Sequence, residues 1–247
     1  IRRPPISTLF PYTTLFRSSV AEEIGTIGNL MRRHEPECLF IIDGALSRRS
    51  QGGSDVSEAV ILCVSAETSA NPEILAEKSS FALTLLQTPA ITQETAILFA
   101  DAIKEHPNQR AILLHGEGPD LSSSSLDTPS LVGYGKVIAN ALRPDTSYLF
   151  LKGAMTDQVL QELLGETNFN NLTLVVEDGT RLFIKPNSLQ KIYDRKVTLA
   201  VLNPLDVRLV CLNPTRSNGQ CLDSQLTLKE LRKRISIPVV DLGPKTM

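Results

Sequence analysis

Three neighbouring segments decide the fold class: CLFIIDG over residues 38–44, AVILCV over residues 59–64 and NPEILAEKSSFALTLLQ over residues 71–87. The first two are short continuous apolar runs bounded by turn residues, which is typical of strands buried on both faces of a parallel sheet. The third begins with Asn71 as a helix cap and Pro72 at the first helical position. Strand, loop, strand and helix in this order predict a parallel α/β sheet.

The same alternation extends outward to both ends of the chain. Helices are predicted over residues 19–35, 93–105, 131–142, 156–164, 187–193 and 226–234, and strands over residues 111–115, 148–151, 172–176, 181–184, 197–202, 207–212 and 238–242. Residues 116–130, rich in Gly, Ser, Asp and Pro, are predicted to form a mobile loop, and Glu177 to Thr180 a hairpin turn. Pro89 breaks the helical pattern, so a boundary is expected there between residues 19–90 and a second α/β domain over residues 91–247.

Residues 1–18, IRRPPISTLFPYTTLFRS, have neither helical nor strand periodicity. The tract closely resembles the translation of sequencing-adapter DNA at the edge of an assembled contig. We therefore expect it to be artefactual or disordered and to make no specific packing contacts. The true start of the protein is expected to lie upstream.

Composition excludes two classes of partner. The chain has 42% apolar and 21% charged residues with a formal net charge of −2, so it lacks the basic excess expected for binding nucleic acid or an anionic membrane. No apolar run approaches the roughly 20 residues of a membrane span. The four cysteines, Cys38, Cys63, Cys211 and Cys221, are far apart and mostly lie in or beside apolar runs. They are predicted to be buried free thiols in a reducing cytoplasm.

The best candidate for chemistry is Asp43, followed by Gly44. An acidic residue at the carboxyl end of a central strand, facing an open crevice, would orient a magnesium ion bound to nucleotide phosphates. The alternative is an ordinary turn. Arg48 and Arg49 follow in the next loop, where they would contact phosphate or a partner's carboxylates, or lie solvated. Because the sequence contains no G-x-x-x-x-G-K-[ST] and no G-x-G-x-x-G, this chain is not expected to hydrolyse ATP.

Other polar residues favour structural interpretations. His34, His106 and His115 lack neighbours at metal-ligand spacing, which argues against zinc, and His115 is more readily a satisfied histidine than a base. Residues 122–125 are four consecutive serines without a G-x-S-x-G elbow, so a linker is favoured over a nucleophile. Residues 213–219 are expected to form a structured turn.

Three stretches together resemble the small subunit of the lysine 5,6-aminomutase reactivase. They are LFIIDGALSRRS over residues 39–50, LVVEDGTRLFI over residues 174–184 and residues 209–223 with their LNPTRSNG core. Residues 54–62, SDVSEAVIL, also fit that family's pattern. Residues 51–53, Gln-Gly-Gly, depart from it, which puts any fine role of that loop in doubt.

The resemblance implies a nucleotide-linked chaperone. In that family, a reactivase uses ATP to exchange damaged cobalamin on an adenosylcobalamin-dependent aminomutase, and its other subunit resembles the MutS-like mismatch-repair ATPases. The small subunit would be P-loop-like, with ATP and magnesium in the full-length protein and no tight binding to this fragment. Asp43 is the one position that matches the family's nucleotide motif, and residues 19–90 would then be the C-terminal part of the P-loop-like domain.

The residues leave three functional hypotheses open. The first is the reactivase subunit, with the aminomutase and the MutS-like ATPase as partners. The second is a metabolic ATP-dependent enzyme of the P-loop ligase type, and the third is a non-catalytic binding module. No complete catalytic site is expected in this fragment under any of the three.

Overall fold

A computed structural model describes residues 21–37, 39–43, 53–54, 57–165 and 171–243. These residues contain seven α-helices: α1 (Ala21–His34), α2 (Pro72–Leu86), α3 (Gln93–Glu105), α4 (Gly135–Ala141), α5 (Asp157–Gly165), α6 (Pro186–Asp194) and α7 (Ser224–Arg234). The strands are β1 (Val60–Ser65), β2 (Ala111–His115), β3 (Ser122–Leu126), β4 (Thr146–Leu151), β5 (Met155–Thr156), β6 (Thr173–Val176), β7 (Leu182–Phe183), β8 (Thr198–Val201), β9 (Val207–Asn213) and β10 (Val239–Asp241). Short 3-10 helices lie at Gly118–Asp120 (η3) and Gly179–Arg181 (η4). Among these helices, none combines the length and apolar character that crossing a bilayer requires.

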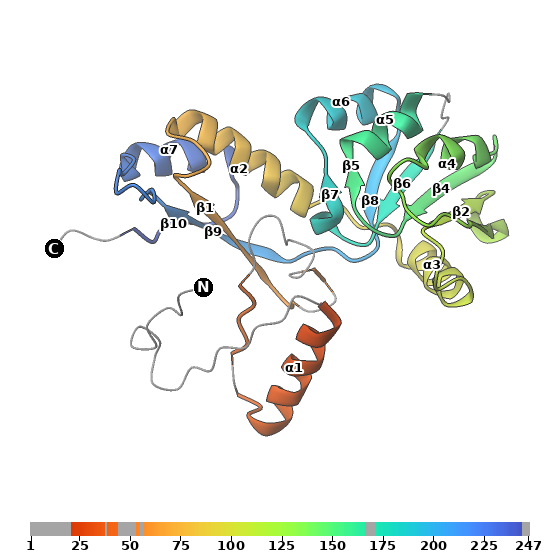
Figure 1. Cartoon of the computed structure of the whole chain (residues 1–247), viewed down its shortest axis with the longest axis horizontal. Coiled ribbons are helices and arrows are strands. Elements are labelled where there is room, and N and C mark those ends of the chain that lie inside the picture. The colour runs from red at the N-terminus through yellow and green to blue at the C-terminus, as the bar shows by residue number, and fades with distance from the viewer. Residues whose placement is uncertain (1–20, 38, 44–52, 55–56, 166–170, 244–247) are drawn as a thin grey trace.

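Sheet A has three parallel strands in the order β1-β9-β10. Helices α2 and α7 pack side by side on one of its faces (Figure 1). The core on that face joins Leu75 and Leu83 of α2, Leu231 of α7, and Val64 and Leu212 of the sheet. The helices that follow β1 and β9, which are α2 and α7, therefore lie on the same side of sheet A.

Sheet B has five strands in the order β3-β2-β4-β6-β8. Strands β4, β6 and β8 are parallel, whereas β2 runs antiparallel to both β3 and β4. One face is covered by α4, α5 and α6, and Leu113, Leu149 and Val176 belong to that core. The other face packs on α3, where Phe99 meets Ile112 with a set of neighbouring apolar side chains. Sheet B is thus buried on both sides.

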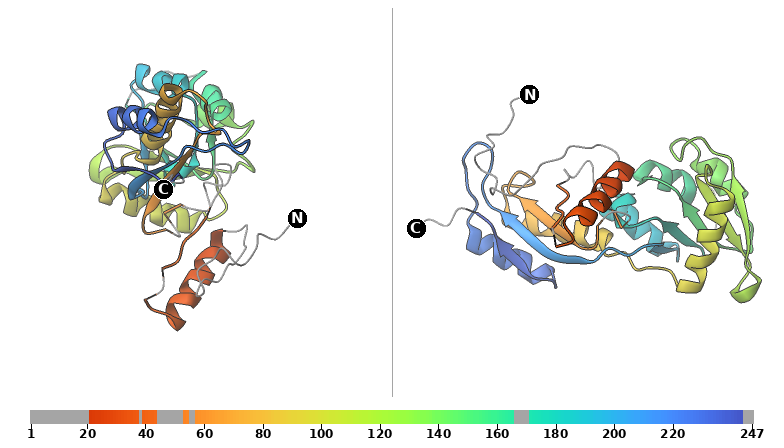
Figure 2. Two further views of the ribbon diagram at one scale, coloured as in Figure 1. Left: turned by 90° about the vertical axis from the view of Figure 1, so that its left-hand side faces the viewer. Right: turned by 90° about the horizontal axis from the view of Figure 1, so that it is seen from below.

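The two sheets lie at opposite ends of an elongated molecule, and α2 runs from one toward the other (Figure 1). The C-terminal end of α2 contributes to both cores, with Leu86 in that of sheet A and Leu85 in that of sheet B. Helix α1 stands apart from both groups in Figure 1 and in the left-hand view of Figure 2. A salt bridge of 2.9 Å between Arg32 of α1 and Glu58 links it to the chain just before β1.

The α/β class and most of the expected elements are confirmed. Helix α3 and strand β2 have the predicted bounds. Helix α2 begins as expected, because the Asn71 side chain accepts hydrogen bonds from the backbone N–H groups of Glu73, at 2.8 Å, and Ile74, at 3.3 Å. Such a cap satisfies amide donors that have no partner within the helix, which is why the signal can be read locally.

Two loop predictions were wrong. Residues 116–130 include strand β3, since the serine run pairs with the free edge of β2 in a regular antiparallel register. Residues 177–180 are not a hairpin turn, because β6 belongs to sheet B while β7 pairs in parallel with β5. In both cases pairing with another strand, β2 for β3 and β5 for β7, rather than local propensity, determines the conformation.

The predicted strand at residues 38–42 was also wrong for its described part, Leu39 to Ile42. These residues have no strand pairing, and Leu39 and Ile41 are 84% and 76% exposed. An apolar run becomes a strand only where a neighbouring backbone supplies hydrogen-bond partners, and none of the described strands pairs with these residues. The predicted terminal tract at residues 1–18 lies outside the described residues.

The sheet pairing also differs from the expected division at residue 90. Strand β9 pairs with β1, and β10 pairs with β9, so residues 207–241 belong to the same sheet as β1 rather than to sheet B. The segment that carries sheet B is inserted between the two parts of sheet A. The P-loop-like description of residues 19–90 stays a prediction.

Candidate functional site

The carboxyl ends of three parallel strands meet at one edge of sheet A. Strand β1 ends at Ser65, β9 at Asn213 and β10 at Asp241. The backbone N–H of Ala66 donates to the carbonyl of Asn213 at 2.9 Å, which holds the first two strand ends together. In open α/β sheets this edge is where ligands bind, because the loops that follow the strands converge there.

The loop after β9 is tightly closed on itself. The Asn213 side chain accepts from the N–H of Thr215 at 3.1 Å, and Thr215 forms a β-bridge with Cys221. At the tip, Gly219 has a φ of 82° and donates to the carbonyl of Arg216 at 2.9 Å. A positive φ of this kind favours glycine, so the structured turn expected from the sequence is confirmed.

Glu67 connects this loop to the end of β1. The backbone N–H of Ser217 donates to the Glu67 carboxylate, and this bond, together with one from the Ser217 side chain and the nearby Arg216, lowers the pKa of Glu67. The Nε of Arg216 is buried and has no hydrogen-bond partner among the described residues. A guanidinium at a strand end is suited to a phosphate or carboxylate, since its N–H groups match the geometry of such anions.

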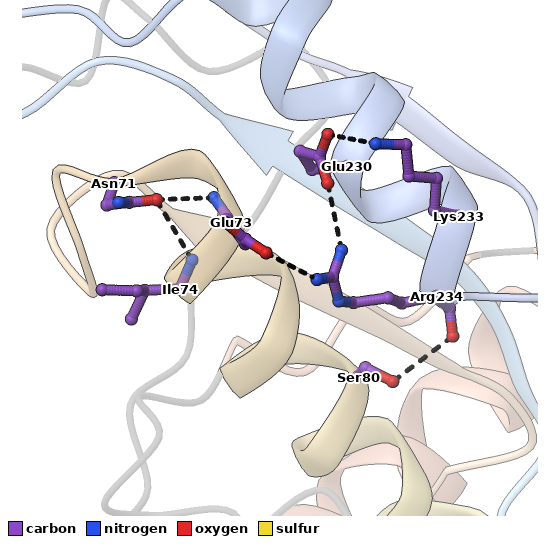
Figure 3. Close-up of polar contacts among 7 residues, drawn as sticks. All are labelled: Asn71, Glu73, Ile74, Ser80, Glu230, Lys233 and Arg234. Carbon is purple, nitrogen blue, oxygen red and sulfur yellow. Dashed lines mark hydrogen bonds and ion pairs between the residues drawn. The ribbon is translucent and has the colours of Figure 1, made fainter.

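Ionic contacts fix α2 and α7 together on the covered face of sheet A (Figure 3). Arg234 lies between Glu73 of α2, at 3.3 Å, and Glu230 of α7, at 3.0 Å. The Ser80 hydroxyl donates to the carbonyl of Arg234 at 3.3 Å. Hydrogen bonds from Lys233 and then Arg234 lower the pKa of Glu230.

The opposite face of sheet A is apolar, with exposed side chains on β1 and just beyond β10, whereas Cys211 of the central strand is buried. Ile61 is 56% exposed, Cys63 is exposed, and Leu242, just beyond β10, is 66% exposed. None of the hydrophobic clusters formed by the described residues includes a side chain of this face. We call Ile61, Cys63 and Leu242, with the sheet surface between them, the open face. Large apolar side chains exposed on one face of a sheet make that face a candidate contact surface.

Asp178 follows β6 and anchors a distant segment. Its side chain is 1% exposed and accepts from the N–H and hydroxyl of Thr180, at 2.8 and 2.5 Å, and from the N–H and hydroxyl of Ser54, at 3.0 and 3.2 Å. Both carboxylate oxygens are therefore occupied. Next to it, a Cβ on Gly179 would lie 2.4 Å from the carbonyl oxygen of Leu85. We interpret this cluster as structural, joining Ser54 and α2 to sheet B.

His115 lies in a polar cluster at the end of β2. It is 3% exposed, and its ring nitrogens contact the hydroxyls of Ser124 at 2.7 Å and Thr146 at 3.0 Å. Burial, and then the positive charge of Arg143, lower its pKa, while Asp145 opposes this. The cluster fits a satisfied neutral histidine, as the sequence suggests.

The predicted site residues are not brought together within the described chain. Asp43 is exposed and lies outside every strand, so the strand-end geometry expected for magnesium is not formed around it. Gly44, Arg48 and Arg49 lie outside the described residues. In the part of the chain that the structure describes, no group of three His, Cys, Asp or Glu side chains is arranged to hold a metal ion. The magnesium role of Asp43 stays a prediction without that structural support.

Sequence reasoning missed Glu67, Ser54 and Cys63 as residues of interest. Glu67 follows β1 by two positions, so the rule that strand ends carry ligand residues would have found it. Ser54 had no such signal, because its partner Asp178 is 124 residues away. The cysteines at positions 63, 211 and 221 are free as predicted, but only Cys211 is buried.

Comparison with protein-family models, with curated proteins and with solved structures found no significant match to this chain.

Proposed function

We propose that this chain acts by contact with other proteins, as a nucleotide-linked chaperone subunit of the lysine 5,6-aminomutase reactivase type. The name rests on the resemblance of residues 39–50, 174–184 and 209–223 to that family. The mode of action rests on one observation, the open face of sheet A. In a doubly wound sheet both faces are covered by helices, and here the described helices α2 and α7 cover only one.

The carboxyl edge of sheet A carries a cationic side chain suited to binding a nucleotide phosphate, which supports the nucleotide-linked part of the proposal. Arg216 brings a buried Nε–H to the end of β9, and Glu67 lies beside it. The proposal assigns Arg216 to a phosphate or carboxylate of the ligand or partner. ATP and magnesium belong to the proposal for the full-length protein, and so does a cytoplasmic location. The ligase-type enzyme is the alternative, and the resemblance of the three stretches is what favours the reactivase.

The test is association with the proposed partners. The chain, extended to its full reading frame, would be mixed with a purified aminomutase and its ATPase partner and passed over a sizing column with and without ATP and magnesium. We expect co-elution that changes with nucleotide, and ATP-dependent release of cobalamin from the aminomutase. Co-elution with neither protein in any nucleotide state would remove the reactivase proposal, and the ligase-type enzyme would then lead.

A matched pair of variants locates the contact. Ile61→Asp places a charge on the open face, whereas Ile97→Asp makes the same change on α3, at a position with nearly the same exposure, 55% against 56%. We expect Ile61→Asp to abolish co-elution and Ile97→Asp to preserve it. Equal loss in both variants would show that the open face is not the contact surface.

A further inference from the structure

Two cysteines face each other across neighbouring strands of sheet A. Cys63 of β1 and Cys211 of β9 are direct partners in the parallel register. Val64 and Leu212, the next pair along, point into the core beneath α2 and α7. Since side chains alternate along a strand, Cys63 and Cys211 both lie on the opposite side, the open face.

The strand spacing suits a disulfide. Neighbouring strands lie about 4.8 Å apart, within the range of about 4.4–6.8 Å between Cα atoms that disulfides span. Among the described strands, β1 is an outer strand with a partner on one side only. It can therefore shift toward β9 without disturbing a second pairing. Burial raises the pKa of the Cys211 thiol, and the nearby Cys63 raises it further.

The two thiols differ in accessibility. Cys63 is exposed to solvent, whereas Cys211 is 5% exposed in the central strand. A small disulfide reagent therefore reaches Cys63 first, while Cys211 is shielded from direct attack. Cys63 is therefore the cysteine that reacts first with the reagent, and Cys211 is the resolving cysteine that attacks the resulting mixed disulfide.

We propose that Cys63 and Cys211 form a redox-active dithiol that closes to a cross-strand disulfide by exchange with a low-molecular-weight disulfide such as oxidised glutathione. The Cys63 thiolate attacks one sulfur of glutathione disulfide, giving a mixed disulfide and releasing one glutathione thiolate. The Cys211 thiolate then attacks the Cys63 sulfur, forming the intramolecular bond and releasing the second glutathione. The protein gives up two electrons and two protons, and the reagent is reduced to two thiols.

This inference does not depend on the proposed function, because it needs only the strand register and the shared face. The bond would tie the outer strand β1 to β9 on the open face. Because β1 has to shift toward β9 for the bond to form, the closed disulfide is strained, and a strained disulfide is more readily reduced. In reducing surroundings the dithiol is therefore expected to stay open, and it closes when the ratio of oxidised to reduced glutathione rises.

The experiment follows the exchange by mass spectrometry on the whole purified chain. The reduced protein is treated with oxidised glutathione, the remaining thiols are alkylated, and tryptic peptides are mapped. We expect a Cys63–Cys211 cross-link that dithiothreitol reverses. Cys211→Ser should instead accumulate a stable glutathione adduct on Cys63, and Cys63→Ser should reduce both products to background.

The control is Cys221→Ser, which removes another exposed thiol and should leave the cross-link unchanged. The denatured chain should give mixed pairings, which establishes that the native link depends on the fold. A stable glutathione adduct on Cys63 of the unmutated protein, with Cys211 still reduced, would overturn the proposal. So would a native mixture of pairings resembling that of the denatured chain.

Discussion

Sheet A and sheet B are built from similar strand residues, but only sheet B is buried on both faces. All five residues of β2 are buried, whereas in β1 Ile61 and Cys63 are exposed. The difference comes from the crossovers: helices lie on both sides of sheet B, and on one side of sheet A among the described residues. An apolar side chain therefore stabilises the fold in one sheet and is free for contact in the other.

The largest effect should come from truncating a side chain inside sheet B. Phe150 is 1% exposed and packs against Phe99, with ring centroids 5.7 Å apart. Phe150→Ala is expected to lower the free energy of unfolding by about 3–5 kcal/mol, because it leaves a cavity in a covered core. Urea denaturation followed by circular dichroism measures the change. A loss below about 1 kcal/mol would mean that sheet B is no better packed than sheet A.

A smaller loss is expected where α2 meets sheet B. A Cβ on Gly179 would clash with backbone atoms of Leu85 and Leu86, at 2.4 and 2.6 Å, and backbone cannot rotate away. Gly179→Ala should therefore cost about 1–3 kcal/mol in unfolding free energy. Gly165→Ala is the control, since a Cβ there would meet no atom within 4 Å. Equal midpoints for the two variants in chemical denaturation would show that this contact is not tight.

His115 should make stability depend on pH. Its pKa in the folded chain lies below the value of about 6.5 expected when unfolded, so below that pH the unfolded chain binds the extra proton first. The free energy of unfolding should fall as the pH drops from about 6.5 and level off below the folded pKa. His115→Asn should flatten this slope, and His34→Asn, at an exposed position of α1, should keep it. Denaturation midpoints across the pH series test this, and an unchanged slope in His115→Asn would assign the pH dependence to other groups.

The smallest effect should come from the open face. Ile61 is 56% exposed, so Ile61→Ala should change the free energy of unfolding by less than about 0.5 kcal/mol. Leu149→Ala in β4, a fully buried position, provides the contrast, with an expected loss of about 2–5 kcal/mol. A loss of similar size at both positions in urea denaturation would mean that the face at Ile61 is covered in solution.

The candidate site was only partly predictable. The loop at residues 213–219 was recognised from its asparagine, proline and glycine, which act on the local backbone. Its neighbour Glu67 was not, because their contact spans 150 residues. Asp43 illustrates the opposite error, in which a run suited to a strand had no described partner strand to pair with.

The sequence by itself determined the elements whose signals are local. In α2 these signals are the Asn71 cap, Pro72 and the spacing of the apolar residues, which all act within a few residues of the chain. In β2 the signal is a short continuous run of apolar residues. Only the tertiary structure decided that β9 joins β1, that a serine run becomes β3, and that Cys63 lies opposite Cys211. Strand pairing depends on hydrogen bonds between two segments, and the periodicity of one segment does not show which other segment supplies its partners.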